Sequence, residues 1–219
     1  MTNLPLELIN TCAALLLLLS FAMLSQRRVL TQVDLYAAQG LVLGVSILIT
    51  AWSTHQPHLY YSAGLTLLLK VLVLPFILHR LIRRLDAIWE TETLLNMPTV
   101  LLIGLLLVMF AFVLAQPISE LATTLTRGTL GIALAVVMLA FLMMITRRKA
   151  VTQVVGFLAM ENGLLFAAAS TTYGMPMVVE LGVGLDVLVG MFILGIFLFH
   201  IREQFESLDL SHLESLKED

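Results

Sequence analysis

The order of hydrophobic and polar positions divides the chain into long apolar segments separated by short polar ones. Each apolar segment is close to the roughly 20 residues that a helix needs to cross the hydrocarbon core of a bilayer. The pattern predicts an all-α, polytopic membrane protein with about seven transmembrane helices. The predicted spans are 5–26, 33–53, 59–79, 97–115, 128–146, 150–171 and 177–200.

The composition supports this class and removes several kinds of site chemistry. Of the 219 residues, 59% are hydrophobic and 12% are charged, whereas soluble domains carry about 25% charged residues. The single cysteine, Cys12, allows neither a disulfide framework nor a cysteine metal site within the chain. No phosphate-binding glycine loop, nucleophile elbow or CxxC motif occurs. We therefore expect no catalytic residue, metal site or redox centre in this chain, and no nucleic-acid partner.

The histidines do not change that expectation. They lie in loops or at the ends of predicted helices, without the pairing inside the membrane that zinc or haem requires. His55 and His58 could bind a metal on the outer side, but solvated loop residues are the simpler interpretation. The five are His55, His58, His79, His200 and His212.

Basic residues gather in alternate loops. With the N-terminus outside, the opposite set of loops and the tail carries nearly all the Lys and Arg, and only Arg127 lies on the outer side. The excess of positive charge in cytoplasmic loops predicts an N-out, C-in orientation. The inner set is Arg27, Arg28, Arg80, Arg83, Arg84, Arg147, Arg148, Lys149, Arg202 and Lys217.

An internal repeat is indicated by two alignments. A shift of 121 places Thr31-Gln32-Val33 on Thr152-Gln153-Val154, each after a basic pair. A shift of 116 places the nine residues from Lys70 on the nine from Asp186, with six identical pairs. We interpret this as a parallel repeat of spans 1–3 and 5–7; the alternative is chance alignment of leucine-rich spans.

The repeat divides the chain into four parts. Residues 1–84 form a first three-helix unit, and 85–126 a cytoplasmic linker and a spacer helix. Residues 127–204 form the second unit, and 205–219 a cytoplasmic tail, which is either a strap on a partner subunit or disordered.

Three ionisable residues lie inside predicted spans: Lys70, Glu161 and Asp186. Each costs about 3 kcal/mol at a helix centre, so such residues are candidates for a function. Glu161 lies about eleven residues from either end of its span, near the midplane. Glu180 is closer to the outer end of the last span, where it is expected to be hydrated. A proton path is the function that buried carboxylates with tunable pKa values favour.

Two neighbours support that path. Asn162 adjoins Glu161, and Pro75 is expected to loosen the backbone hydrogen bonding near Lys70. The alternative is a static ion pair that locks helices together. The sequence leaves open whether Lys70 pairs with Glu161 or with Asp186.

The segment Gly156-Phe157-Leu158-Ala159-Met160-Glu161-Asn162-Gly163, with Val179-Glu180-Leu181-Gly182 and Asp186, resembles the hydrogenase-4 component E family. This family comprises membrane subunits of group 4 nickel-iron hydrogenases and formate hydrogenlyases. The segment Lys70-Val71-Leu72-Val73-Leu74-Pro75 also looks like it, and the resemblance covers nearly the whole chain. The last three spans are similar to the K-type subunit of respiratory complex I and the C subunit of cation/proton antiporters. Those subunits match at Asp186 but depart at Leu158, where their first glutamate would fall.

The resemblance implies a non-catalytic membrane-arm subunit beside antiporter-like subunits, in the lipid bilayer, which contributes charged residues to a proton-translocation path. Nickel-iron and iron–sulfur centres would belong to partner subunits of the oxidoreductase complex, and this chain would bind no cofactor. Two other functions stay open: a structural adaptor between antiporter-like subunits, and an independent secondary ion transporter. The residues do not distinguish protons from sodium ions.

Overall fold

Long helices make up nearly all of the part of the chain that the structure, a computed structural model, describes. The described residues are 4–54, 57–84, 94–121, 127–171, 182, 185, 189 and 190. The helices are α1 (Leu4–Ser25), α2 (Val29–Thr54), α3 (Pro57–Leu67), the π-helix η1 (Leu68–Val73), α4 (Leu74–Arg84), α5 (Met97–Leu121), α6 (Arg127–Thr146) and α7 (Ala150–Thr171).

The helices confirm the prediction of an all-α, polytopic membrane protein. Within the described residues, six helices are long and apolar enough to cross a membrane, and α3, η1 and α4 together form one of them. These six agree with the first six predicted spans to within a few residues. Only four residues of the predicted seventh span, 177–200, are described, and none of the tail, 205–219. The count of seven spans therefore stays a prediction.

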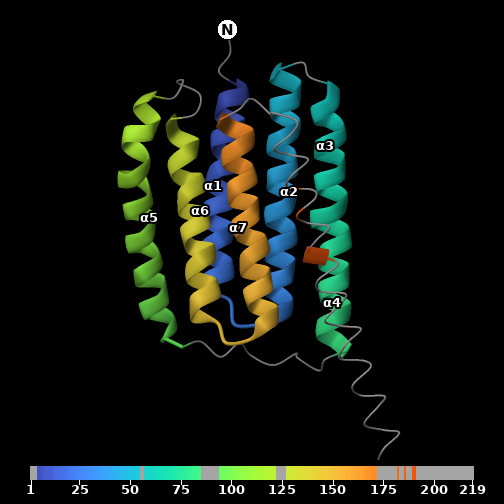
Figure 1. The fold of residues 1–219 in the computed structure, drawn as a ribbon, viewed down its shortest axis with the longest axis vertical. Helices are drawn as coiled ribbons and strands as arrows, with labels where there is room; N and C mark the ends of the chain where they lie inside the picture. Colours follow the sequence, from blue (N-terminus) through green and yellow to red (C-terminus); the bar gives the residue numbers. More distant parts are fainter. Residues whose placement is uncertain are drawn as a thin grey trace, which may run out of the picture.

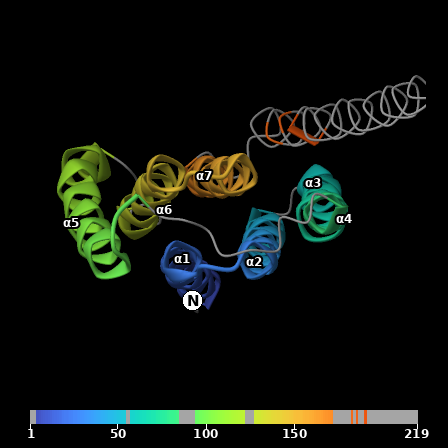
Figure 2. The same cartoon turned by 90° about the horizontal axis from the view of Figure 1, so that it is seen from below.

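The helices stand side by side in two layers. Seen along the helix axes, α1, α2 and the continuous α3–η1–α4 helix form one layer, and α5, α6 and α7 form the other (Figure 2). The layers meet where α1 packs on α6 and where α2 packs on α7. The buried apolar core lies between them and includes Leu16, Leu43, Leu78, Leu158 and Phe166.

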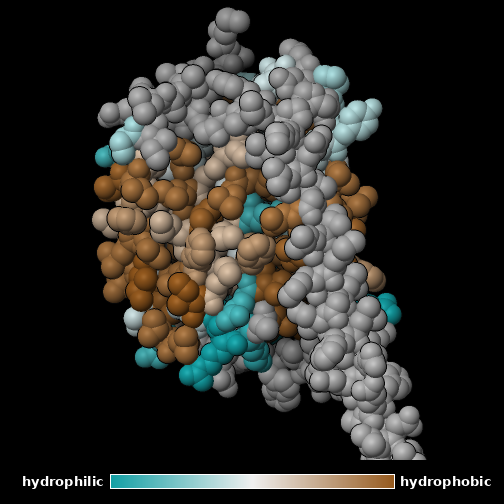
Figure 3. All heavy atoms as spheres, in the orientation of Figure 1, coloured by the Kyte–Doolittle hydropathy of each residue, from teal (hydrophilic) through white to brown (hydrophobic). Residues whose placement is uncertain are grey.

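The outer surface of the bundle is apolar, as a bilayer requires. Leu18, Leu72, Phe76, Val113 and Ile145 are between 64% and 69% exposed, which would be costly in water for so many large side chains. A broad hydrophobic belt covers the face shown in Figure 3, with hydrophilic residues gathered at its lower end. Since lipid is as apolar as these side chains, tight packing and interhelical hydrogen bonds must hold the helices together.

The basic residues of the described loops share one end of the bundle. The α1–α2 and α6–α7 connections and the end of α4 all lie at the bottom of Figure 1. This agrees with the alternation of loops in the sequence. The orientation relative to the membrane stays a prediction.

The two connections at that end contain the same hydrogen bonds, 121 residues apart. The Gln32 side-chain Nε2 donates to the carbonyl of Gln26 at 2.8 Å, and Gln153 Nε2 donates to the carbonyl of Arg147 at 3.0 Å. Matching backbone bonds join Gln32 N–H to Arg28 and Gln153 N–H to Lys149. The shift is the one found in the sequence. The division into two repeated units and the four parts of the chain nevertheless stay predictions.

Arg147 joins the two connections. Its guanidinium is buried, only 1% exposed, and Nη2 donates to the carbonyls of Leu24 at 2.8 Å and Gln26 at 2.7 Å. These carbonyls belong to the end of α1, where helical partners run out, and a cation is favoured there by the helix dipole. Burial and the nearby charge of Arg27 lower the pKa of Arg147 to about 10, so it stays protonated at neutral pH. The sequence had indicated only a loop cation.

Replacing Arg147 by glutamine is expected to destabilise the bundle by about 2–3 kcal/mol, because hydrogen bonds to charged groups contribute this order. The Leu24 carbonyl loses its charged donor, and the Gln26 carbonyl keeps the bond from Gln32. The measurement is the thermal unfolding midpoint of the purified protein in mild detergent. Arg148→Gln removes the same charge from an exposed neighbour and serves as the control. Equal unfolding midpoints for the two variants would contradict the structural role of Arg147.

Candidate functional site: a buried ion pair and its hydrogen-bond chain

Lys70 and Glu161 form a buried ion pair between η1 and α7. Lys70 Nζ lies 3.3 Å from Glu161 Oε1, and the two side chains are 0% and 6% exposed. The pairing that the sequence left open is therefore with Glu161 in the described part of the chain. Two opposite charges this close offset part of the desolvation that each would suffer alone in the membrane.

A chain of hydrogen bonds extends from this pair across the bundle. Lys70 Nζ donates to Asn162 Oδ1 at 2.8 Å, and Asn162 Nδ2 donates to Gln39 Oε1 at 3.2 Å. Gln39 Nε2 donates to Ser20 Oγ at 2.9 Å, and Ser20 Oγ donates to the carbonyl of Leu16 at 2.8 Å. All four side chains are buried. The chain thus connects η1, α7, α2 and α1 through the centre of the core.

The local backbone brings Lys70 towards the interior. Pro75 has no N–H to continue the α-helical pattern, and the preceding turn is the π-helix η1, in which Leu74 N–H bonds to the carbonyl of Leu69. This is the altered hydrogen bonding that Pro75 predicts beside Lys70. On the facing helix α2, a Cβ added to Gly40 would lie 2.9 Å from Lys70 Cβ. Only glycine lets the two helices approach this closely. Short π-helical turns are frequent at functional sites.

A cavity lined by residues of α7, together with Gly182 and Leu185, adjoins Glu161. It holds about 380 Å³ and is almost wholly apolar apart from Glu161. Apolar cavities stay dry, so within this lining only the Glu161 carboxylate offers a hydrogen-bond partner to water. The other lining residues are Phe157, Met160, Leu164, Leu165, Gly182 and Leu185. Leu185 directly precedes Asp186 in the sequence.

A polar stripe on α2 leads from the basic end of the bundle to this site. Gln32, Tyr36 and Gln39 are each 0% exposed, and their spacing of four and three residues places them on one helix face. Gln32 Oε1 and, on α3, Thr66 Oγ1 have no hydrogen-bond partner within the described residues. Most buried polar atoms in proteins have a hydrogen-bond partner, which is either another protein group or an ordered water.

A second, more exposed pair lies nearer the basic end of the bundle. His79 Nε2 is 3.3 Å from Asp34 Oδ1, and His79 Nδ1 is 2.9 Å from the carbonyl of Pro75. The side chains of His79 and Asp34 are 29% and 65% exposed. A ring with hydrogen on both nitrogens would donate to both acceptors. The sequence had indicated His79 only as a helix-end residue, and Asp34 not at all.

The remaining predicted site residues cannot be placed beside this network. Glu180 and Asp186 lie outside the described residues, so a role for them in the path stays a prediction. Among the described residues, no group of three or more His, Cys, Asp or Glu side chains has the geometry of a metal site.

The missed residues had a sequence signal. Ser20, Gln39 and Tyr36 are polar side chains within apolar spans. The spacing of Gln32, Tyr36 and Gln39 alone indicates a polar face on an otherwise apolar helix.

These features define a class: a polytopic helical membrane protein with a buried ion pair at its centre. The sequence of this chain is 34% identical to that of the uncharacterized protein Rv0085 of Mycobacterium tuberculosis. The alignment spans 212 residues, which is 96% of each protein. The chain is 26% identical over 96% of its length to hydrogenase-4 component E of Escherichia coli K12, of which 97% is covered, and equally to that of Shigella flexneri. The chain belongs to the hydrogenase-4 component E family. No family model and no solved structure matches it.

Proposed function

We propose that this protein is a non-catalytic membrane subunit of a hydrogenase-type oxidoreductase complex, and that Lys70 and Glu161 belong to an ion-translocation path through it. Similarity to hydrogenase-4 component E over nearly the full length supports the first part. The single observation that carries the second part is the buried Lys70–Glu161 pair at the centre of a membrane bundle. Ionisable groups at such depth are costly and commonly mark ion paths.

The chemistry of the pair suits protons. In the ion-paired state Glu161 is a carboxylate and Lys70 an ammonium. A proton that reaches Glu161 from the adjoining cavity neutralises its carboxylate. Lys70 is then a buried cation that has lost its ion-pair partner, although it still donates to the amide oxygen of Asn162. That state favours release of a proton from Lys70 to water along the polar face of α2, after which proton transfer between the two residues resets the pair. The hydrogen bonds of Asn162 and Gln39 keep Lys70 oriented between the two routes.

The surroundings of the pair supply a route on each side of it. Gln32, Tyr36 and Gln39 form a polar face from the basic loops to Asn162. The His79–Asp34 pair lies near the end of this face that adjoins the basic loops. Glu180 and Asp186 in the last predicted span would continue the path on the other side of Glu161. Leu185, the neighbour of Asp186, already lines the cavity at Glu161.

We further propose that the chain lies in the cytoplasmic membrane of a bacterium or archaeon, beside antiporter-like subunits of the same complex. In this proposal, other subunits of the complex bind the nickel-iron and iron–sulfur centres and carry out the redox chemistry. Energy from that chemistry would drive ion movement past Lys70 and Glu161. Protons are the proposed ion, and replacing sodium by potassium in the assay distinguishes them from sodium.

The test uses the complex purified by a tag on this subunit and reconstituted in liposomes. Asn162→Leu leaves Lys70 and Gln39 without their shared partner, so redox-driven proton movement is expected to fall several-fold while the subunits still copurify. A pH-sensitive dye inside the vesicles gives the rate. Asn10→Leu, at an exposed position of α1, is the matched control. Wild-type rates in Asn162→Leu, or isolation of the protein without redox subunits, would contradict the proposal.

A structural adaptor is the second candidate. The observation that favours it is the hydrogen-bond chain itself, which crosses from α7 to α1 and ties the two layers together. An adaptor needs the network for stability but not for ion movement. The two functions therefore separate when stability and ion movement are measured on the same variants.

A further inference from the structure

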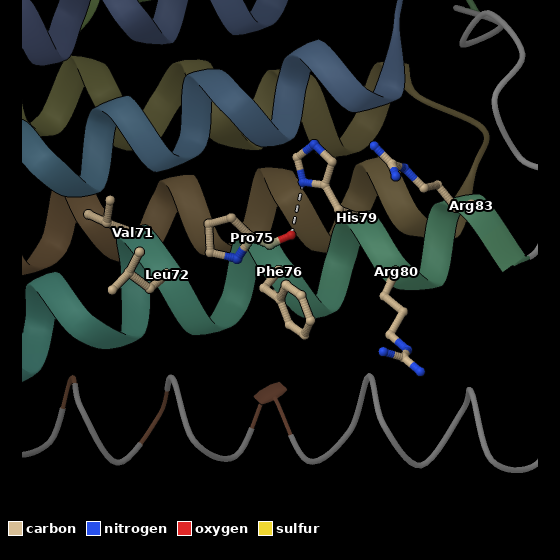
Figure 4. A pocket seen from close by; sticks show the side chains of 7 residues that line it. All are labelled: Val71, Leu72, Pro75, Phe76, His79, Arg80 and Arg83. Carbon is tan, nitrogen blue, oxygen red and sulfur yellow. Dashed lines mark hydrogen bonds between the residues drawn. The ribbon is translucent and has the colours of Figure 1, made fainter.

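A groove runs along the outer face of α4, away from the buried ion pair. It holds about 660 Å³ and begins beside η1 and ends at the basic end of the bundle. Figure 4 shows Leu72, Phe76 and Arg80 on one side of the helix, and His79 and Arg83 on the other, with Pro75 between them. The lining residues are Val71, Leu72, Pro75, Phe76, His79, Arg80 and Arg83.

The first half of the groove is apolar and open. Leu72 and Phe76 are 64% and 65% exposed, lie four residues apart on the same helix face, and are within the membrane-crossing part of the helix. In a bilayer, this part of the helix would lie at the depth of the hydrocarbon layer. An acyl chain would lie against these two side chains without exposing any unsatisfied polar group.

The second half is cationic. Arg80 and Arg83 are both exposed and lie at the end of the bundle that carries the basic loops (Figure 1). His79 pairs with the carboxylate of Asp34, so the net positive charge of the groove comes from the two arginines. Both arginines line the groove, and their guanidinium groups point to different sides of the helix in Figure 4. Guanidinium groups bind phosphate oxygens through two parallel hydrogen bonds.

We propose that this groove binds one anionic phospholipid, with an acyl chain along Leu72 and Phe76 and the phosphate headgroup at its arginine end, which Arg80 and Arg83 line. The order of the groove, apolar in the membrane and cationic at its edge, matches the order of a phospholipid. A soluble anion would use the arginines but not the apolar half. An acidic segment of a partner subunit would use the arginines as well, and the test below separates it from a lipid.

The position of the groove connects the lipid to the site. Leu72 belongs to η1, the same π-helix that carries Lys70, and Pro75 ends its irregular hydrogen bonding. A lipid packed on Leu72 and Pro75 would contact this turn on its groove side, whereas Gly40 of α2 contacts it on the side of the bundle core. The proposal does not depend on ion translocation and holds equally for an adaptor.

The test measures lipid binding to the protein purified in mild detergent with the subunits that accompany it. After delipidation, phosphatidylglycerol or cardiolipin is added back, with phosphatidylcholine as the zwitterionic comparison, and bound lipid is counted by native mass spectrometry. The Arg80→Gln/Arg83→Gln variant is expected to bind anionic lipid roughly 25-fold more weakly, about fivefold for each arginine. Binding of phosphatidylcholine should change little.

Three controls sharpen the result. Arg27→Gln/Arg28→Gln removes two exposed arginines from the same end of the bundle and should keep the affinity. Arg80→Lys/Arg83→Lys keeps the charge and should retain most of the preference for anionic lipid, which guards against a merely misfolded variant. A photo-crosslinking residue at Phe76 should capture lipid. Capture of a polypeptide there, equal loss in the control pair, or no preference for anionic lipid in the wild type would overturn the proposal.

Discussion

Replacing Lys70 by methionine is expected to reduce redox-driven proton movement at least tenfold in the reconstituted complex. Methionine has a similar length and no charge, so it fills the space beside Gly40 while it removes the group that bonds to both Glu161 and Asn162. Without an ammonium at this point, Glu161 has no lysine to which a proton can pass. The initial rate of acidification or alkalinisation inside the vesicles, at matched redox turnover, is the measurement.

Two further variants separate the causes of a loss at Lys70. Lys70→Arg keeps a cation but not one that gives up its proton readily, so assembly should be retained while proton movement stays low. Lys149→Met removes a lysine from the basic loop and should leave proton movement unchanged. Proton movement at the wild-type rate in Lys70→Met would remove this residue from the path.

The helices were predictable because membranes impose a simple rule. A backbone inside hydrocarbon must satisfy its own hydrogen bonds, so a run of about 20 apolar residues becomes a helix whatever it packs against. The boundaries of α1, α6 and α7 follow from the apolar runs and the polar residues beside them. The depth of Glu161 followed from the same counting.

The pairing within the site was less predictable, because it depends on how helices are rotated against one another. Lys70 and Asn162 are separated by 92 residues, and the sequence offered Glu161 and Asp186 equally as partners for Lys70. What decides the contact is the close approach that Gly40 allows and the turn of η1 before Pro75. A proline within a span indicates that the backbone pattern changes, but not in which direction the displaced side chain points.

Arg147 illustrates a different limit. Counting loop cations predicts orientation and treats all of them alike, yet Arg147 is buried and its neighbour Arg148 is exposed. The difference arises from carbonyls at the end of α1, which are remote in the sequence. Gln32 and Gln153 each form a hydrogen bond within their own connection, at equivalent positions 121 residues apart. Arg147 forms the hydrogen bonds that join the α6–α7 connection to the α1–α2 connection.

Replacing Glu161 by glutamine is the second change with a large expected effect. Glutamine keeps the shape but cannot carry a proton as a carboxylic acid does, so redox-driven proton movement should again fall at least tenfold. Lys70 would be left as a buried cation without its carboxylate, and breaking a buried pair from one side typically costs about 3–5 kcal/mol. The unfolding midpoint of the variant is therefore expected to fall as well. Glu7→Gln, at an exposed position of α1, should change neither quantity.

The double variant Lys70→Met/Glu161→Gln distinguishes an ion path from a static lock. Neutralising both partners removes the uncompensated charge, and such replacements of buried ion pairs are often neutral for stability. The unfolding midpoint should therefore recover relative to Glu161→Gln, a coupling that a double-mutant cycle measures. If the pair only holds η1 against α7, ion movement recovers with stability. If the pair carries protons, stability recovers and proton movement does not, because neither residue of the pair can then take up or release a proton.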